Sequence, residues 1–233
     1  MIISKRPGVI SNAIDLTSTA REITFTLTEA LECLPGSFIN VFMNIDGEQV
    51  RRAFSIVTTN STEKTVSVAV RNSPNGKMTP KFWESTIIGT PVEIMGPMGK
   101  NTSDKLTATS IHLFAFGIGA GIINAITEHA LQDTHVQKIS IVTGSRNESD
   151  IVYKSYFDEL AKKYPHISVR YVISNPVSEN YPFTGYIQNH VEDMNFDNSD
   201  VYMCGQEAAC NGLIEAIQKK NPQNVTFFVE AFH

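Results

Sequence analysis

The segment of this sequence that most directly suggests chemistry is a run of alternating glycines at residues 116–122, Phe-Gly-Ile-Gly-Ala-Gly-Ile. It lies between an apolar, strand-like run and a helical pattern. Glycines in that position let the backbone approach a pyrophosphate, and the helix start offers unpaired N–H groups and the positive end of its dipole. The candidate phosphate-binding residues are Gly117, Gly119, Ala120, Gly121 and Ile122. A plain tight turn would produce the same pattern, so the segment alone leaves both interpretations open.

Two further glycines follow apolar runs later in the chain. Ser145 and Arg146 come directly after Gly144, which places a hydroxyl and a cation at a strand end, where ligands of open α/β sheets bind. Cys204 precedes Gly205 at the end of another such run, so a thiol there could lie beside a ligand. Read singly, the arginine is more typical of an exposed loop than of a binding site, and the cysteine is more typical of a small buried side chain.

A cation, an aromatic ring and a hydroxyl occur together in residues 51–55, Arg-Arg-Ala-Phe-Ser. On a strand, Arg52 and Phe54 share one face and Ser55 points the other way. On its own, this pattern is more typical of an amphipathic strand than of a binding site.

No metal site is predicted. The three cysteines, Cys33, Cys204 and Cys210, cannot form a disulfide framework and are one short of a four-thiolate or iron–sulfur site. The six histidines include no helical pair with i, i+4 spacing, so a zinc site has no support.

The elements that must position these residues differ between the two halves of the chain. In the first hundred residues, apolar and polar residues alternate with a period of two, which indicates half-buried strands. Strands are expected at 23–27, 38–45, 53–57, 65–70 and 92–95, with a hairpin turn at Asp46-Gly47 and a short helix at 79–84. Strands at this spacing predict a small antiparallel barrel.

Beyond Lys100, apolar strand-like runs alternate with longer helical patterns. Strands are expected at 111–116, 138–143, 168–173, 200–203 and 225–229, and helices at 122–131, 151–164, 184–191 and 207–219. Short connections with crossover helices predict a parallel sheet wound in the right-handed sense. The boundary falls within the polar stretch 99–108, so the expected domains are 1–103 and 104–233.

Composition excludes several classes of partner. The chain has 233 residues, 42% of them hydrophobic, and a net charge of −5 with the charges interspersed, so nucleic acid is not an expected partner. The longest apolar stretch, 111–126, is too short and too polar to span a bilayer. No secretory signal is visible at the start of the sequence, so we expect a cytoplasmic protein.

The order of the motifs along the chain is more informative than any one of them. R-x-F-S at 52–55, G-x-x-T at 76–79, G-P-x-G at 96–99, G-x-G-x-G-I at 117–122, C-G at 204–205 and E-x-F at 230–232 follow one another. This order resembles that of the ferredoxin–NADP reductase superfamily, and the likeness covers nearly the whole chain. The resemblance implies an N-terminal, antiparallel Greek-key flavin-binding β-barrel followed by a Rossmann-like, parallel-sheet nucleotide-binding domain, with the flavin ring between them.

The resemblance assigns flavin-binding roles in the first half. Arg52 corresponds to the arginine that holds a flavin phosphate, Phe54 to the aromatic residue that packs on the flavin, and Ser55 to the serine near flavin N5. The strand end and the turn that contact the flavin ring edge and phosphates correspond to Val70, Arg71, Gly76, Lys77, Met78 and Thr79. The implied cofactor is FAD. Asn101 stands where an aromatic residue often stacks on adenine, so FMN is also open.

The second half receives the pyridine-nucleotide roles. Besides the glycine loop, Ser145, Arg146 and Asn175 are implied contacts of the nucleotide. Arg146 is a cation suited to the extra phosphate of NADPH, which inclines the expectation to NADPH, with NADH left open. Cys204 and Gly205 correspond to the pair beside the nicotinamide, and Glu230 and Phe232 to the C-terminal acid and aromatic residue. The residues implied in catalysis are Ser55, Cys204, Glu230 and Phe232.

The function that the resemblance implies is an NAD(P)H-dependent flavoprotein oxidoreductase. Hydride passes from the nicotinamide to bound FAD, and electrons go on to a separate acceptor such as ferredoxin, flavodoxin or an oxygenase component. One alternative is an NAD(P)H:flavin reductase that uses free flavin as a substrate. Another is a non-catalytic electron-transfer subunit of a larger complex.

Overall fold

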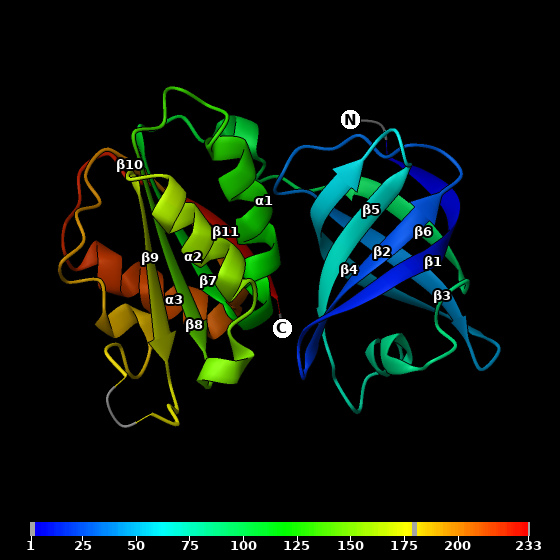
Figure 1. The fold of residues 1–233 in the computed structure, drawn as a ribbon. Helices are drawn as coiled ribbons and strands as arrows, with labels where there is room; N and C mark the ends of the chain where they lie inside the picture. The colour runs from blue at the N-terminus through cyan, green and yellow to red at the C-terminus, as the bar shows by residue number, and fades with distance from the viewer. Residues whose placement is uncertain (1–2, 179–180, 233) are drawn as a thin grey trace. The chain divides into compact units, whose positions relative to one another are not determined.

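The computed structural model describes residues 3–178 and 181–232 and forms two compact units, residues 1–102 and 103–233 (Figure 1). The division lies one residue before the domain boundary expected from the sequence. His233, the last residue of the second expected domain, lies outside the described residues.

The first unit is a closed barrel with the strand order β1-β2-β5-β4-β3-β6, in which all the paired strands run antiparallel. The strands are β1 (Ser4–Thr17), β2 (Ala20–Leu27), β3 (Phe38–Ile45), β4 (Glu48–Asn60), β5 (Thr65–Arg71) and β6 (Pro91–Met98). Ile23, Phe25 and Leu27 alternate into the core as their period predicts. Asp46 and Gly47 take positive φ angles of 50° and 83° and form the tight turn between β3 and β4.

The second unit is a parallel sheet with the order β11-β10-β7-β8-β9. Its strands are β7 (Ser110–Phe116), β8 (Lys138–Ser145), β9 (Ile167–Ile173), β10 (Ser199–Gln206) and β11 (Thr226–Phe232). The helices are α1 (Ala120–Ala130), α2 (Lys154–Lys163) and α3 (Glu207–Gln218). Right-handed crossovers place α1 and α2 on one face of the sheet and α3 on the other (Figure 1). The doubly wound arrangement brings the ends of β7, β8 and β10 to one edge.

The prediction of a helix at 184–191 is wrong. The structure has only the three-residue 3₁₀ turn η5 (Ile187–Asn189) there. Thr184 forms an isolated parallel bridge with Ile173 of β9, and Gly185 follows with a φ of +94°. Neither conformation is helical, so an α-helix cannot begin at Thr184 or Gly185. The helix expected at 79–84 is a 3₁₀ helix, η1 (Thr79–Trp83), and α2 begins at Lys154, after Tyr153 in a left-handed conformation. No helix within the described residues is long and apolar enough to cross a membrane.

His112 on β7 is a buried titratable group whose charge state couples to stability. Its side chain is fully buried. Burial, and then the nearby charge of Lys138, lower the pKa of His112 from 6.5 to about 4. The native protein therefore keeps a neutral imidazole at pH values where the unfolded chain binds a proton.

We predict that the free energy of unfolding falls as the pH falls from about 6.5 toward 4, by up to about 1.4 kcal/mol per pH unit. The stabilisation is fully present above the unfolded pKa and is lost as the pH approaches the folded pKa. Urea unfolding at pH 7.5, 6.0 and 5.0 measures this slope. His112→Phe should flatten it, whereas His135→Gln, at an exposed histidine, should leave it unchanged. An unaltered slope in His112→Phe would assign the effect to other groups.

Candidate functional site

The start of α1 has the features of an anion-binding helix terminus. Residues Gly117–Gly119 form a 3₁₀ turn that leads directly into α1, and Gly117 has a φ of +59°. The first turn of α1 contains no acidic residue, and no described side chain caps it. The N–H of Ala120 donates back to the carbonyl of Gly117 in the 3₁₀ turn. No described side chain caps the N–H groups that follow it, and the positive end of the helix dipole is not neutralised.

Gly119 lies against the end of β10. A Cβ atom on Gly119 would come within 2.3 Å of the carbonyl oxygen of Cys204, and one on Gly205 within 2.4 Å of Cβ of Phe116. The predicted glycine loop and the predicted Cys-Gly pair therefore pack against each other, although they are far apart in the sequence. Of the other predicted loop residues, Ala120 and Ile122 are buried.

Cys204 lies near the carboxyl end of β10, between the neighbouring strands β7 and β11. It pairs in register with Ala115 of β7 and Glu230 of β11, and Gln206 pairs with Phe232. Burial, followed by the charge of Glu230, raises the pKa of the Cys204 thiol well above its ordinary value, so the group stays protonated at neutral pH. The thiol is therefore a neutral, packed group and not a thiolate nucleophile. Phe232 is 37% exposed at the end of β11.

The loops after β8 and β9 are joined to each other. The N–H of Ser174 donates to the carbonyl of Ser145 at 3.0 Å, and the N–H of Asn175 donates to the carbonyl of Arg146 at 2.7 Å. The side chains of Arg146 and Asn175 are exposed. The three predicted nucleotide contacts on this side thus form one continuous surface at the sheet edge.

Glu148 is a residue of this surface that sequence reasoning missed. Its carboxylate accepts hydrogen bonds from the N–H groups of Val177 and Ser178, both at 3.0 Å. These bonds lower the pKa of Glu148 and keep it ionised. The only signal in the sequence was an acidic residue two positions after Arg146, and its pairing with a loop almost thirty residues away could not be read from that spacing.

In the barrel, the predicted flavin contacts lie on β4. Arg52 is exposed, and its guanidinium donates to the carbonyl of Arg51 at 2.7 Å. It forms no ion pair in the part of the chain that the structure describes, so most of its donors are open to an anion. Phe54 is half-buried and packs edge-on against Phe82, with ring centroids 6.0 Å apart. Ser55 pairs in register with Phe38 of β3.

The turn at 76–79 is held by its own polar groups. The N–H of Gly76 donates to the carbonyl of Ser73 at 2.7 Å, and Thr79 Oγ1 accepts from the N–H of Ser73 at 3.2 Å. Lys77 forms an exposed ion pair with Glu48 at 2.7 Å.

Two of the residues predicted to contact the flavin can do so only through their main-chain groups. Met78 and Val70 are buried in the barrel core, so only their main-chain groups are available to a ligand. Arg71, next to Val70 at the end of β5, donates to Thr19 Oγ1 at 3.3 Å.

These residues fit the two cofactors by the chemistry of their donors. An exposed guanidinium beside an aromatic face suits a flavin with a pyrophosphate, and an uncapped helix start between glycines suits a dinucleotide. Thr143 Oγ1 on β8 and Asn124 Oδ1 on α1 are buried and have no hydrogen-bond partner among the described residues, so each has capacity left for a bond to another molecule. Residues 3–178 and 181–232 contain no cluster of histidine, cysteine and acidic groups that could hold a metal ion.

Two family models match the chain, one on each unit. The oxidoreductase FAD-binding domain matches residues 7–102, and the oxidoreductase NAD-binding domain matches residues 113–223. The two matches occur in the order that the motifs predict.

Curated relatives agree with these matches. "Uncharacterized oxidoreductase AIM33" of Saccharomyces cerevisiae is 30% identical over 160 residues, which are 68% of this chain and 51% of that protein. The toluate 1,2-dioxygenase electron transfer component of Pseudomonas putida is 24% identical over 97% of this chain and 67% of its own length. NADH-cytochrome b5 reductase 1 of Dictyostelium discoideum is 27% identical over 82% of this chain and 70% of its own length. The chain thus spans about half to two thirds of the length of these relatives.

The fold is also that of solved structures. The Amycolatopsis cytochrome P450 reductase GcoB superposes with a TM-score of 0.86 at 21% identity, over 99% of this chain and 70% of that one. Together, the ordered motifs, the barrel followed by the parallel sheet and the two domain matches lead to one conclusion. This chain belongs to the ferredoxin–NADP reductase superfamily, with an oxidoreductase FAD-binding domain followed by an oxidoreductase NAD-binding domain.

Proposed function

We propose that this protein is a flavoprotein reductase that takes hydride from a nicotinamide dinucleotide onto bound FAD and passes electrons to a separate protein acceptor. The observation that carries the proposal is the presence of both domains on one chain, at 7–102 and 113–223, with site residues that fit each cofactor. The relative named as an electron transfer component supports delivery to a protein partner. With three cysteines, these 233 residues cannot build a four-thiolate iron–sulfur centre of their own.

Bound FAD would supply the chemistry of a hydride acceptor that can release its electrons singly. The chain's own residues bind and orient. Arg52 and the turn at 76–79 hold the flavin phosphates, and Phe54 offers an aromatic face to the ring. Ser55 offers a hydroxyl near flavin N5, and Val70 and Arg71 line the ring edge.

The second unit orients the donor. The start of α1, from Gly117 to Ile122, holds the nucleotide phosphates, while Ser145, Arg146 and Asn175 contact its adenosine end. Cys204, Gly205, Glu230 and Phe232 position the nicotinamide. Because the Cys204 thiol is neutral and packed, we assign it a positioning contact and no proton transfer.

Cys204→Ala is predicted to slow the reduction of bound FAD by NADH about tenfold, because loss of the thiol lets the nicotinamide depart from reacting geometry. Rapid mixing under anaerobic conditions measures this rate, and the FAD content should stay at the wild-type value. Cys33→Ala, which removes a thiol from the barrel, is the matched control. An unchanged rate in Cys204→Ala would exclude the thiol from the site.

We further propose that NADH is the donor. Arg146 is a cation that would suit the additional phosphate of NADPH, but Glu148 holds an ionised carboxylate two residues away, fixed to the neighbouring loop. A negative charge there disfavours binding of the additional phosphate of NADPH, which is a dianion. The relative named NADH-cytochrome b5 reductase supports the same choice.

Glu148→Gln is therefore predicted to raise kcat/KM for NADPH about fivefold, because it removes a negative charge that repels the additional phosphate at a solvent-screened surface. The value for NADH should change little. Steady-state kinetics with both donors measure the ratio, and Glu159→Gln on the exposed side of α2 serves as the control. A wild-type preference for NADPH that Arg146→Ala abolishes would overturn the choice of NADH.

The rival activity is reduction of free flavin. It requires flavin to leave after each turnover, whereas the open donors of Arg52 favour retention of a phosphate-bearing flavin. The colour of the purified protein discriminates between the two. A yellow protein that keeps its FAD through gel filtration supports the proposal, and a colourless one that reduces added FMN supports the rival.

A further inference from the structure

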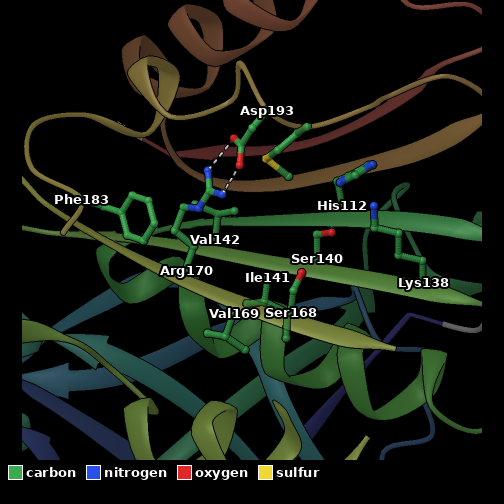
Figure 2. A pocket seen from close by; sticks show the side chains of 11 residues that line it. His112, Lys138, Ser140, Ile141, Val142, Ser168, Val169, Arg170, Phe183 and Asp193 are labelled. Carbon is green, nitrogen blue, oxygen red and sulfur yellow. Dashed lines mark hydrogen bonds and ion pairs between the residues drawn. The ribbon is translucent and has the colours of Figure 1, made fainter. Parts of the chain in front are cut away.

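A cavity of about 280 Å³ opens on the α3-facing side of the parallel sheet, toward the amino ends of its strands. It is lined from β7, β8 and β9 and from the connection between β9 and β10 (Figure 2). The glycine loop and Cys204 lie at the opposite, carboxyl ends of the strands. The cavity is therefore distinct from the proposed nucleotide site.

The cavity exists because the β9–β10 connection forms no α-helix among its described residues. On the same sheet face, Leu213 and Ile217 of α3 belong to one buried cluster with Phe114, Val201 and Met203. Over β8 and β9, the irregular segment that carries Phe183, Asp193 and Met194 lies across the strands instead. Connections of this length without regular structure are uncommon and are often functional.

A row of polar residues crosses the sheet under this segment. Register pairs His112 with Ser140 and Ser140 with Ser168, so the three side chains lie side by side on one face of β7, β8 and β9. The next row along the strands holds Val142 beside Arg170. His112 and Ser140 are buried and Ser168 is exposed, so the row runs from the covered sheet face to solvent. Buried polar groups are normally hydrogen-bonded, so the ring of His112 requires partners for its nitrogens.

His112 is the clearest member of that row. Its ring is fully buried and packs against Phe196, with centroids 4.7 Å apart. The backbone of Asn195 is the one group that pairs with the ring, so at least one ring nitrogen has no hydrogen-bond partner in the described part of the chain. The ring lines the cavity, so its polar edge is available to a bound molecule.

Lys138 brings a positive charge to the same end. Figure 2 shows its amino group pointing toward His112, and Lys138 forms no ion pair within the described ranges. Arg170, at the other end, is neutralised by Asp193 through bonds of 2.9 and 2.6 Å, and its guanidinium stacks on Phe183. Lys138 is exposed, so one cation without an ion-pair partner among the described residues lies at the mouth of the cavity.

We propose that this cavity binds a small organic monocarboxylate, with its carboxylate at Lys138, His112 and Ser140 and its hydrocarbon part against Val142 and Met194. A single negative charge balances the single cation, whereas a phosphate dianion would leave a second charge uncompensated. An inorganic ion has no hydrocarbon part that could pack against the apolar side chains of the cavity wall. The volume suits a molecule of benzoate size and excludes a dinucleotide.

Benzoate is the probe for this site, with benzamide as its neutral isostere. For the FAD-loaded protein, we expect benzoate to bind with a dissociation constant of about 1 mM and to raise Tm with concentration. Benzamide and inorganic phosphate should bind at least about tenfold more weakly. Long-range proton–nitrogen spectra should show the His112 nitrogens shifting as benzoate is added. NADH-dependent activity should be unaffected, because the cavity lies away from the donor site.

Lys138→Met should weaken benzoate at least about tenfold, and Ser140→Ala severalfold, whereas Lys219→Met at the exposed end of α3 should leave it unchanged. If Lys138→Met fails to fold, Ser140→Ala and the His112 signals still decide the question. The proposal is overturned if benzoate does not bind, if benzamide binds as well as benzoate, or if benzoate competes with NADH. Equal binding to wild type and Lys138→Met would also overturn it.

Discussion

Replacing Gly119 with alanine is expected to lower kcat/KM for NADH by about 100-fold or more, since misplacing reacting groups by about 1 Å can cost that much. The added Cβ would lie 2.3 Å from the carbonyl oxygen of Cys204. The Cβ would be fixed to the backbone of the 3₁₀ turn that leads into α1, and the oxygen belongs to the backbone of β10, so neither can move aside as the end of a flexible side chain would. The start of α1 must shift, and the N–H groups that hold the nucleotide phosphates shift with it.

Gly212→Ala is the matched control for this prediction. Gly212 lies in α3, where a Cβ would meet only side-chain atoms of Gln188, at 3.7 and 3.9 Å. That substitution should leave kinetics unchanged and stabilise the helix by about 0.5–1 kcal/mol. FAD content should be the same in both variants, because the FAD-binding match lies in the other unit. Full activity in Gly119→Ala would show that the start of α1 does not position the donor.

Replacing Arg52 with glutamine is expected to weaken FAD binding by about 10- to 100-fold, because hydrogen bonds to a charged donor contribute about 1.5–3 kcal/mol. Its guanidinium donates one hydrogen bond to the carbonyl of Arg51, and the side chain is exposed on β4. Glutamine keeps a donor of similar reach but loses the charge, so the change isolates electrostatic attraction to the flavin phosphates. Titration of the apoprotein with FAD, followed by flavin fluorescence, gives the dissociation constant.

Arg51→Gln is the control, because Arg51 is equally exposed and adjacent but points to the opposite face of the strand. It removes the same charge from the same strand, so general electrostatic effects are matched. Equal losses in the two variants would mean that net charge and not a specific contact determines affinity. Unchanged FAD binding in Arg52→Gln would remove this residue from the phosphate site.

Most strands and helices could be predicted from the sequence because their apolar residues recur with a clear period. The predictions failed where a segment is held by contacts with residues that are distant in the sequence. The strand β1 (Ser4–Thr17) was not predicted, since Pro7 and Gly8 interrupt its pattern. Pairing with β2 and β6 on both sides holds it in the closed barrel, and Gly8 packs closely on Leu27. Such tertiary support is invisible in local propensity.

The glycine loop and the Cys-Gly pair were found as separate motifs, but their contact was not. It depends on β10 pairing next to β7, and the strand order cannot be read from spacing. The contact of Glu148 with Val177 and Ser178 has the same origin. The cavity beside His112 follows from a missing crossover helix, which the apolar pattern at 184–191 had suggested would be present.

The absorption spectrum of the purified chain, recorded anaerobically before and after NADH is added, tests the central claim most directly. The account predicts one bound FAD per chain, whose visible band bleaches on addition of NADH and returns when an electron acceptor is supplied. A protein that takes up no FAD when reconstituted, or holds FAD that NADH leaves oxidised, would contradict it.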